Sequence, residues 1–214
     1  MSKSTAKMAI ALLLTAALAT PAFAADDRPT GVVKEATEQL QAQIRAHHNE
    51  FVVDRAVYYQ RVRETVAPAF DLPYASQLVL GKYWRTASAE QRRRFQSAFA
   101  TTVIDTYADA LLDRAGSIEL RWMLSSIEAL NRTAAVRASA KTDLSSPLAI
   151  VFALHLDDAN RWLVYDITFE GVSLVTTFRS QFATEVRARG LEAVIARLEA
   201  AQNLPPASSL AQAR

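Results

Sequence analysis

The sequence predicts an α+β domain in which helices come first, an antiparallel sheet follows and two helices close the chain. Up to Gly116, apolar residues recur at every third or fourth position, which is the spacing of one helix face. From Ser117 the spacing changes to every second position over four consecutive segments, and after Gly171 the helical spacing returns. Short connections between the four segments favour an antiparallel meander of about four strands with about six or seven helices.

The first two helices have recognisable ends. Thr30 is expected to cap a helix that continues to about His48. Asp54 is expected to cap a second helix. That helix ends at Ala67-Pro68, because the residue before a proline avoids the helical region.

Two further helices are expected before the sheet. Residues 74–80 form a short helix that ends at Gly81, a residue type common just after a helix. The longest helix begins at Ser88, whose side chain and that of Gln91 form a capping box, and it ends near Gly116. Its stripe of large apolar side chains consists of Phe95, Phe99, Val103, Tyr107 and Leu111.

The four predicted strands differ in how their two faces are covered. Residues 117–124 and 133–142 alternate between apolar and polar, so each is expected to have one solvated face. Residues 148–156 are apolar on both faces, which indicates a central covered strand. The fourth strand, residues 162–169, follows a polar turn at residues 157–160.

Beyond the sheet we expect two helices and a disordered tail. Gly171 supplies backbone freedom at the corner, and Ser173 can cap the helix that follows. Gly190 ends that helix, and the last helix begins at Leu191. Residues 204–214 show no periodicity, so we expect them to be disordered.

The first 24 residues have the pattern of a cleaved Sec-type signal. Lys3 and Lys7 precede an apolar run of 12 residues, 8–19, and residues 22–24 have the small-x-small pattern that signal peptidase accepts. The run is shorter than the roughly 20 residues that span a bilayer. There is no cysteine, which excludes disulfides and the lipid-modified cysteine of a bacterial lipoprotein. We therefore expect an exported, soluble protein with one domain over residues 25–203.

The charge balance argues against nucleic acid as a partner. Loss of the signal removes two of the 24 basic residues and none of the 22 acidic residues, so the remaining chain carries equal numbers of each. A nucleic-acid-binding protein is expected to retain a positive field.

Motifs for catalysis or metal binding are weak. The nucleophile elbow G-x-S-x-G is absent. His47 and His48 are adjacent on a helix and point about 100° apart, so they do not form an i, i+4 metal pair. A surface metal with Glu50 stays open as an alternative, but a solvated helix end is favoured. His155 lies alone in a strand and is interpreted as a hydrogen-bonded sheet residue.

Asp166 has two possible roles. It lies in an otherwise apolar strand, where a buried carboxylate needs a partner. It could be a general base whose pKa is raised by an apolar cavity. It could instead be tied to backbone N–H groups near the turn of residues 171–173, or to Arg179. The structural role is favoured, because no second catalytic group is evident to complete an acid–base pair.

The excess of apolar residues also permits two interpretations. A strand that is apolar on both faces, together with large apolar stripes on two helices, can form a thick core or the wall of a ligand cavity. Periodicity does not separate these two possibilities.

Two long blocks of residues resemble the MlaC family of periplasmic phospholipid-binding proteins, also described as toluene-tolerance or ABC-transporter auxiliary proteins. The first block, residues 70–92, reads FDLPYASQLVLGKYWRTASAEQR, and it continues through the stripe of the long helix, where Val103 stands in place of the usual leucine. The second block reads WLVYD at 162–166 and EGVSL at 170–174, followed by Arg179. The resemblance spans about residues 29–200.

The resemblance implies an NTF2-like curved sheet whose helices enclose an apolar pocket for the acyl chains of a phospholipid. It implies a periplasmic, non-enzymatic carrier with no cofactor other than the bound phospholipid cargo. Its expected partners are the MCE-domain subunit of an inner-membrane ABC transporter and an outer-membrane lipoprotein associated with a porin. We expect the carrier to be a monomer.

Residues on apolar stripes of the elements that the family places around its pocket are expected to bind lipid. They are Leu78, Tyr83, Phe99, Val103, Tyr107, Leu111, Phe152, Val164, Val172, Leu174 and Phe178. Structural roles are expected for Asp166, Gly171, Ser173 and Arg179.

Two other functions remain as alternatives. The chain could be an NTF2-like isomerase or hydratase that uses Asp166 as its base. It could also be an adaptor that regulates the transporter without carrying lipid.

Overall fold

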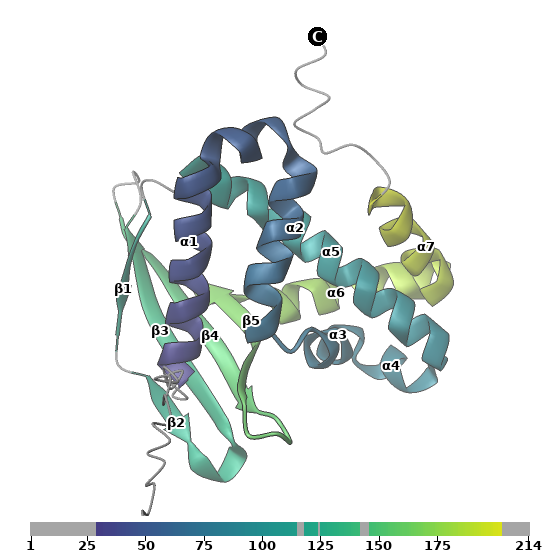
Figure 1. Cartoon of the computed structure of the whole chain (residues 1–214). Helices are drawn as coiled ribbons and strands as arrows, with labels where there is room; N and C mark the ends of the chain where they lie inside the picture. Colours follow the sequence, from purple (N-terminus) through teal and green to yellow (C-terminus); the bar gives the residue numbers. More distant parts are fainter. Residues whose placement is uncertain (1–28, 115–117, 124, 142–145, 203–214) are drawn as a thin grey trace, which may run out of the picture.

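The computed structural model describes residues 29–114, 118–123, 125–141 and 146–202. The expected signal and the expected C-terminal tail lie outside these residues. One side of the molecule holds the sheet with α1 and α2, and the other holds α3, α4, α6 and α7 (Figure 1). The long helix α5 (Ala89–Arg114) joins the two sides.

The first two helices form an antiparallel pair. Helix α1 (Pro29–Val53) begins one residue before the predicted cap Thr30 and continues past the predicted end, with non-helical dihedral angles at His47. The predicted cap was therefore wrong, since the helix has already begun at Pro29, whereas the predicted end coincides with a kink at His47 beyond which the chain continues as a helix to Val53. In α2 (Arg55–Val66) the expected cap is confirmed, since the Val57 N–H donates to the carboxylate of Asp54 (3.1 Å).

A short 3₁₀ turn, η1 (Ala67–Ala69), leads from α2 to α3 (Leu72–Leu80). The chain then turns at Gly81 into α4 (Lys82–Thr86), a helix that periodicity did not predict. Gly81 has φ +54° and ψ −120°, a conformation that L side chains rarely adopt, so glycine is required between the two helices.

The sheet contains the four predicted strands and two short ones, and all its ladders are antiparallel. The strand order is β1-β3-β4-β5-β6, and β2 also pairs with β3. The strands are β1 (Glu119–Trp122), β2 (Ser126–Glu128), β3 (Thr133–Lys141), β4 (Leu148–Leu156), β5 (Trp162–Phe169) and β6 (Val172–Ser173), with a 3₁₀ turn, η2 (Ala129–Asn131), between β2 and β3.

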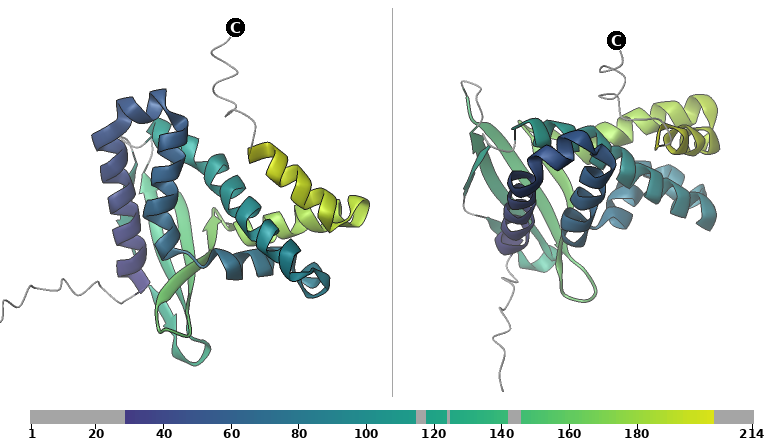
Figure 2. Two further views of the ribbon diagram at one scale, coloured as in Figure 1. Left: turned by 45° about the vertical axis from the view of Figure 1, so that its right-hand side comes forward. Right: turned by 45° about the horizontal axis from the view of Figure 1, so that its top comes forward.

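One face of the sheet is buried under helices. Val136, Phe152 and Leu154 lie on this face, and Val33 of α1 packs into the same cluster. Figure 2 shows α1 lying across the strands, while α6 leaves the sheet at its β5–β6 edge. The covered strand that the apolar run 148–156 predicted is confirmed as β4, with β3 and β5 as its neighbours.

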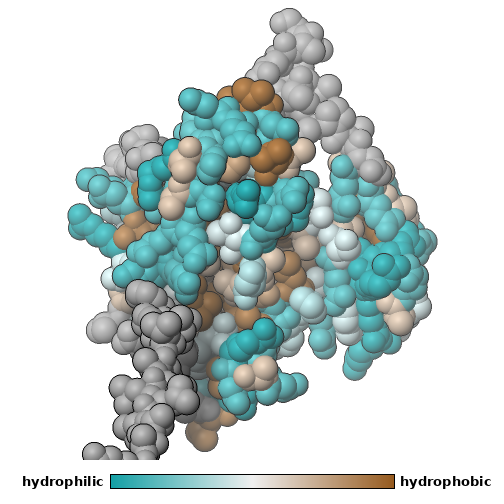
Figure 3. Space-filling view, viewed as in Figure 1, coloured by the Kyte–Doolittle hydropathy of each residue, from teal (hydrophilic) through white to brown (hydrophobic). Residues whose placement is uncertain are grey.

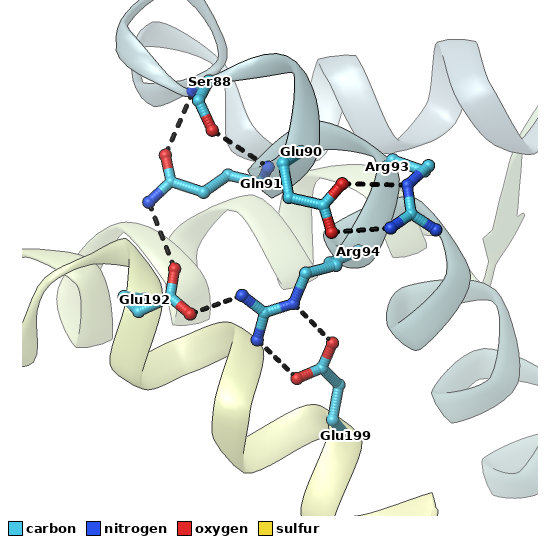
Figure 4. A network of polar contacts seen from close by, with 7 residues as sticks. All are labelled: Ser88, Glu90, Gln91, Arg93, Arg94, Glu192 and Glu199. Atoms are coloured by element: carbon cyan, nitrogen blue, oxygen red, sulfur yellow. Dashed lines mark hydrogen bonds and ion pairs between the residues drawn. The ribbon is translucent and has the colours of Figure 1, made fainter.

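The last two helices, α6 (Leu174–Arg189) and α7 (Leu191–Gln202), pack on α5. The capping box at the start of α5 is confirmed: the Gln91 N–H donates to Ser88 Oγ and the Ser88 N–H to Gln91 Oε1, both at 3.1 Å. The same turn is tied to α7, because Arg94 binds Glu192 (2.5 Å) and Glu199 (2.6 Å) (Figure 4).

Candidate functional site

The buried apolar residues form three hydrophobic clusters, two of which contain residues of α5 and one of which contains residues of the sheet. The helix cluster lies among α3, α5, α6 and α7, with Phe95, Phe99 and Phe182 at its centre. The α1–α2 cluster packs Tyr58 and other residues of α1 and α2 on the second half of α5. The sheet cluster lies between α1 and strands β3 to β5.

Large apolar side chains at the margins of these clusters are only half-buried, and we call this set the junction residues. Figure 3 shows apolar surface in the middle of the molecule, between the teal surfaces of its two sides. Side chains of this size are fully buried in the centre of a well-packed core, so these lie where the clusters reach the surface. The junction residues are Leu78, Val103 and Phe178 of the helix cluster, Val66 and Leu111 of the α1–α2 cluster, and Ile167 and Phe169 of the sheet cluster, together with Tyr107.

Tyr107 links α5 to the sheet. Its ring stacks on that of Phe169 in β5, with the ring centres 6.4 Å apart. Burial raises the pKa of the Tyr107 hydroxyl, so the side chain stays neutral at physiological pH. Farther along the same face of the sheet, the rings of Trp122 and Phe152 lie 6.3 Å apart. Aromatic groups therefore follow the covered face from β1 to β5.

The predicted lipid-binding residues are distributed over all three clusters. Five belong to the helix cluster: Leu78, Tyr83, Phe99, Val103 and Phe178. Leu111 packs against the α1–α2 cluster, and Phe152 and Val164 belong to the sheet cluster. Leu174 is half-buried at the start of α6, and Tyr107 bridges α5 and β5.

Burial separates this predicted set into three groups. Phe99, Phe152 and Val164 are only 4%, 7% and 1% exposed, so they are core residues in this conformation. Val172 is 59% exposed on β6, outside the packed interior. The other seven are half-buried, and Tyr83 is held by a hydrogen bond from its hydroxyl to the Ala183 carbonyl (3.4 Å).

Neither of two shallow hollows in the part of the chain that the structure describes is lined by the predicted set. One of about 370 Å³ lies between α1 and β1, with a floor of Ile118, Leu120 and Trp122 and a polar rim. The other, about 350 Å³, lies between α5 and α7 and is lined mostly by charged and polar residues.

The corner between β5 and α6 is organised by Asp166. Its carboxylate accepts hydrogen bonds from Ser173 Oγ (2.6 Å) and from the Val175 N–H in the first turn of α6 (3.0 Å). Ser173 Oγ in turn accepts from the Thr176 N–H (3.0 Å). Both oxygens of Asp166 are thus used to hold the start of the helix against the strand.

The backbone at this corner takes two consecutive left-handed residues, Glu170 (φ +47°) and Gly171 (φ +81°). The Glu170 carboxylate accepts a hydrogen bond from the Ala149 N–H, which fixes the corner to β4. Arg179 does not serve as the partner of Asp166. Its Nε donates instead to the Leu78 carbonyl at the end of α3 (2.6 Å).

Periodicity missed a cluster of polar and aromatic side chains on the outer side of β4 and β5. Asp71 caps α3 with one oxygen (Tyr74 N–H, 2.8 Å) and contacts His155 Nε2 with the other (2.9 Å). Tyr74 stacks on His155, and Tyr165 packs edge-on against both rings. Asp71 and His155 are 84 residues apart, so no local pattern could have paired them.

A second group of polar side chains that the sequence pattern did not predict lies between α2 and α5. Arg55 and Asp109, and likewise Arg63 and Asp105, approach to 3.6 Å, and the Tyr59 hydroxyl donates to Asp109 (2.9 Å). Nη1 of Arg55 and Oδ1 of Asp105 are buried without a hydrogen-bond partner among the described residues. Burial raises the pKa of Asp105, while the nearby Arg63 lowers it.

Neither a metal cluster nor a membrane-spanning helix is found in the described ranges. No three histidine, aspartate or glutamate side chains come together there as a metal-ligand group. His47 contacts only Glu50 as an ion-pair partner (3.2 Å), on an exposed part of α1. No described helix is long and apolar enough to cross a bilayer.

Comparison with known proteins places these features in a family. The family model described as MlaC protein matches residues 34–200. The "Intermembrane phospholipid transport system binding protein MlaC" of Haemophilus influenzae is 25% identical over 201 residues, which covers 92% of each chain. The toluene tolerance protein ttg2D of Pseudomonas putida is 25% identical over 166 residues, covering 76% of this chain and 74% of the relative.

A solved structure has the same fold. The phospholipid-binding protein of Ralstonia solanacearum, determined in complex with a phospholipid, superposes with a TM-score of 0.73 at 25% sequence identity. The match covers 80% of this chain and 94% of the other. The predicted α+β class with a curved antiparallel sheet is thereby confirmed.

Proposed function

The chain belongs to the MlaC family, and from this premise we propose that it is a periplasmic phospholipid carrier. It would hold the acyl chains of one lipid among the junction residues and leave the head group in solvent. In this proposal the protein moves lipid between an inner-membrane ABC transporter, through its MCE-domain subunit, and an outer-membrane lipoprotein complex. No covalent bond is made or broken, and phospholipid is cargo rather than cofactor.

The observation that carries the proposal is the set of half-buried junction residues at the margins of the three clusters. They come from α2, α3, α5, α6 and β5, which belong to both sides of the molecule, and the proposal places an elongated apolar ligand among them. Each methylene removed from water contributes about 0.8 kcal/mol, so sheltering about fifteen is worth about 12 kcal/mol. Such a gain is enough to hold a lipid in water.

We propose that loading opens the junction. The hollows of about 370 and 350 Å³ are lined by none of the junction residues. In this proposal the α1–α2 side and the helix side separate around α5 to admit the lipid. The α2–α5 contact is suited to such opening, because its two ion pairs at 3.6 Å leave buried polar atoms without hydrogen bonds.

We propose that residues 1–24 are a cleaved Sec signal, that residues 25–203 form one lipid-binding domain, and that the carrier is monomeric. The hand-over requires partners that offer a continuous apolar path, because a tightly held lipid leaves slowly into water.

The test is the lipid content of the purified protein. The secreted chain would be analysed by native mass spectrometry and by organic extraction, and the apo form would be incubated with phospholipid vesicles. We expect about one phospholipid per chain. The variant Val103→Trp would fill the junction and reduce the lipid content, whereas Ala196→Trp, on the exposed face of α7, is the matched control. Absence of phospholipid from wild type, both as purified and after incubation, would contradict the proposal.

A further inference from the structure

A group of cations and aromatic residues gathers where α3 ends and α4 begins, facing the first half of α6. We call it the α4 basic patch. Residues 72–89 and 171–184 contain no aspartate or glutamate, although the whole chain has 22 acidic residues. The α4 basic patch consists of Lys82, Tyr83, Trp84, Arg85, Arg92 and Arg179.

The cations of this patch have no ion-pair partner among the residues that the structure describes. No carboxylate in the described ranges pairs with Lys82, Arg85, Arg92 or Arg179, whereas ten other basic side chains do have such a partner. Glu90, the acid that follows α4 in sequence, forms an ion pair with Arg93 instead.

The patch is held in a fixed geometry by contacts that leave its charge available. Arg179 lies over Gly81 and uses Nε to bind the Leu78 carbonyl (2.6 Å), so this bond does not occupy its two terminal nitrogens. Arg92 stacks over the Trp84 ring at 5.1 Å and binds the Trp84 carbonyl through Nε (3.0 Å). Two guanidinium groups are thus oriented before any partner arrives, which reduces the entropy cost of binding.

We propose that the α4 basic patch is a docking surface for an acidic protein surface, and that this partner receives or delivers the lipid. This proposal rests on the proposed carrier function. The composition of the α4 basic patch favours a protein over a bilayer, because arginine, tyrosine and tryptophan are the residues that dominate protein–protein binding energy. Carboxylates can also engage guanidinium groups in bidentate fashion.

A bilayer fits the surface less well. Each cation contributes about 1 kcal/mol at an anionic membrane, so four would bind weakly without insertion of apolar groups. The large apolar side chains that are exposed in the described ranges lie on α1, β2, η2 and β6 and at Met123, just after β1, and none belongs to the patch.

The position of the patch suits a hand-over. Tyr83 and Trp84 pack against the helix cluster, as do Leu78 and Phe178 of the junction residues. In Figure 1, α4 lies at the end of α5 that is farthest from the sheet, where a partner can approach without meeting α1 or α2. A partner docked there would contact the elements that carry the junction.

The test measures binding of the lipid-loaded full-length mature chain to the purified soluble MCE-domain subunit of the transporter from the same organism. We expect the double variant Lys82→Glu/Arg85→Glu to weaken binding at least about tenfold, and Lys82→Gln/Arg85→Gln to weaken it less. Wild-type binding should fall as salt is raised. The control Arg121→Glu/Lys141→Glu changes net charge equally on the far strands β1 and β3 and should bind like wild type.

The outcomes separate this proposal from the carrier function. Equal affinity of the double variants and wild type, or no salt-sensitive binding of wild type, would overturn the docking proposal. So would a loss of binding to phosphatidylglycerol vesicles with binding to the subunit unchanged, because that result assigns the patch to a membrane. Lipid content, measured on every variant, reports on the carrier function independently, and thermal denaturation shows that each variant is folded.

Discussion

The carboxylate of Asp166 accepts a hydrogen bond from Ser173 Oγ at 2.6 Å, across the corner where β5 turns into α6. Its second oxygen accepts from the Val175 N–H, so one strand residue caps the helix that closes the helix side of the molecule. Carboxylates at a helix start satisfy free N–H groups and interact favourably with the helix dipole. The hydrogen bonds of Asp166 therefore attach the start of α6 to β5.

We expect Asp166→Asn to lower the free energy of unfolding by about 1–3 kcal/mol, because one oxygen acceptor and the charge are lost at a half-buried site. Chemical denaturation would measure the change, with Asp158→Asn on an exposed turn as the control. An Asp166→Asn protein as stable as wild type would contradict this structural role and would favour the alternative in which Asp166 is a general base.

Phe99 and Phe178 are neighbours in the helix cluster, with ring centres 5.2 Å apart, yet only Phe99 is fully buried. We expect Phe99→Ala to cost about 3–5 kcal/mol of stability. Phe178→Ala should lower the free energy of unfolding by less than Phe99→Ala does. For the same loss of stability, it should reduce the lipid content of the purified protein more. Thermal denaturation and lipid extraction on both variants test this difference. Equal effects on both measurements would show that Phe178 is ordinary core.

The Arg94 bridge to Glu192 and Glu199 should make the attachment of α7 depend on pH. Hydrogen bonds from Arg94 lower the pKa of both carboxylates. A lowered pKa means that the stabilisation is present above the unfolded value of about 4.3 and is lost as pH falls through the folded values. We expect Arg94→Met to be less stable than wild type at pH 7, with the gap closing in acid. A gap that is constant with pH would indicate lost packing instead.

The two acids that face α2 should respond oppositely to neutralisation. Burial raises the pKa of Asp105, so its contribution to stability is present at low pH and lost as pH rises through the folded pKa. Asp105→Asn should therefore leave the protein as stable as wild type at pH 7, or more so. Asp109→Asn should destabilise it, because Asp109 accepts from the Tyr59 hydroxyl and faces Arg55. Urea denaturation at pH 5 and pH 7 would distinguish them.

Local sequence patterns were sufficient for the long elements. Strands β4 and β5 have the predicted bounds, and the capping pairs at Asp54, Ser88 and Ser173 act as predicted. These features depend on contacts within four residues or on a simple alternation. The short helix α4 and strands β2 and β6 were not predicted, because two to five residues are too few to show a period.

The candidate site could be predicted only as a set of stripes. The sequence pattern placed Phe99, Val103 and Tyr107 on one face of α5, but it gave no means to tell which would be buried. In the structure Phe99 is enclosed by Phe95, Phe178 and Phe182, while Tyr107 meets Phe169 of the sheet. The difference depends on α6 and β5, which lie far along the chain from α5.

The sequence by itself determined the class of the fold, the order of its elements and, through two long motifs, its family. Periodicity and capping are local consequences of backbone geometry, so they can be recognised in one chain. Only the tertiary structure decided which apolar residues remain half-buried at the junction and that Asp71 meets His155. It also decided that the cations near α4 have no carboxylate partner within the described ranges. These properties arise when segments distant in sequence are brought together, and packing against such neighbours sets both burial and charge pairing.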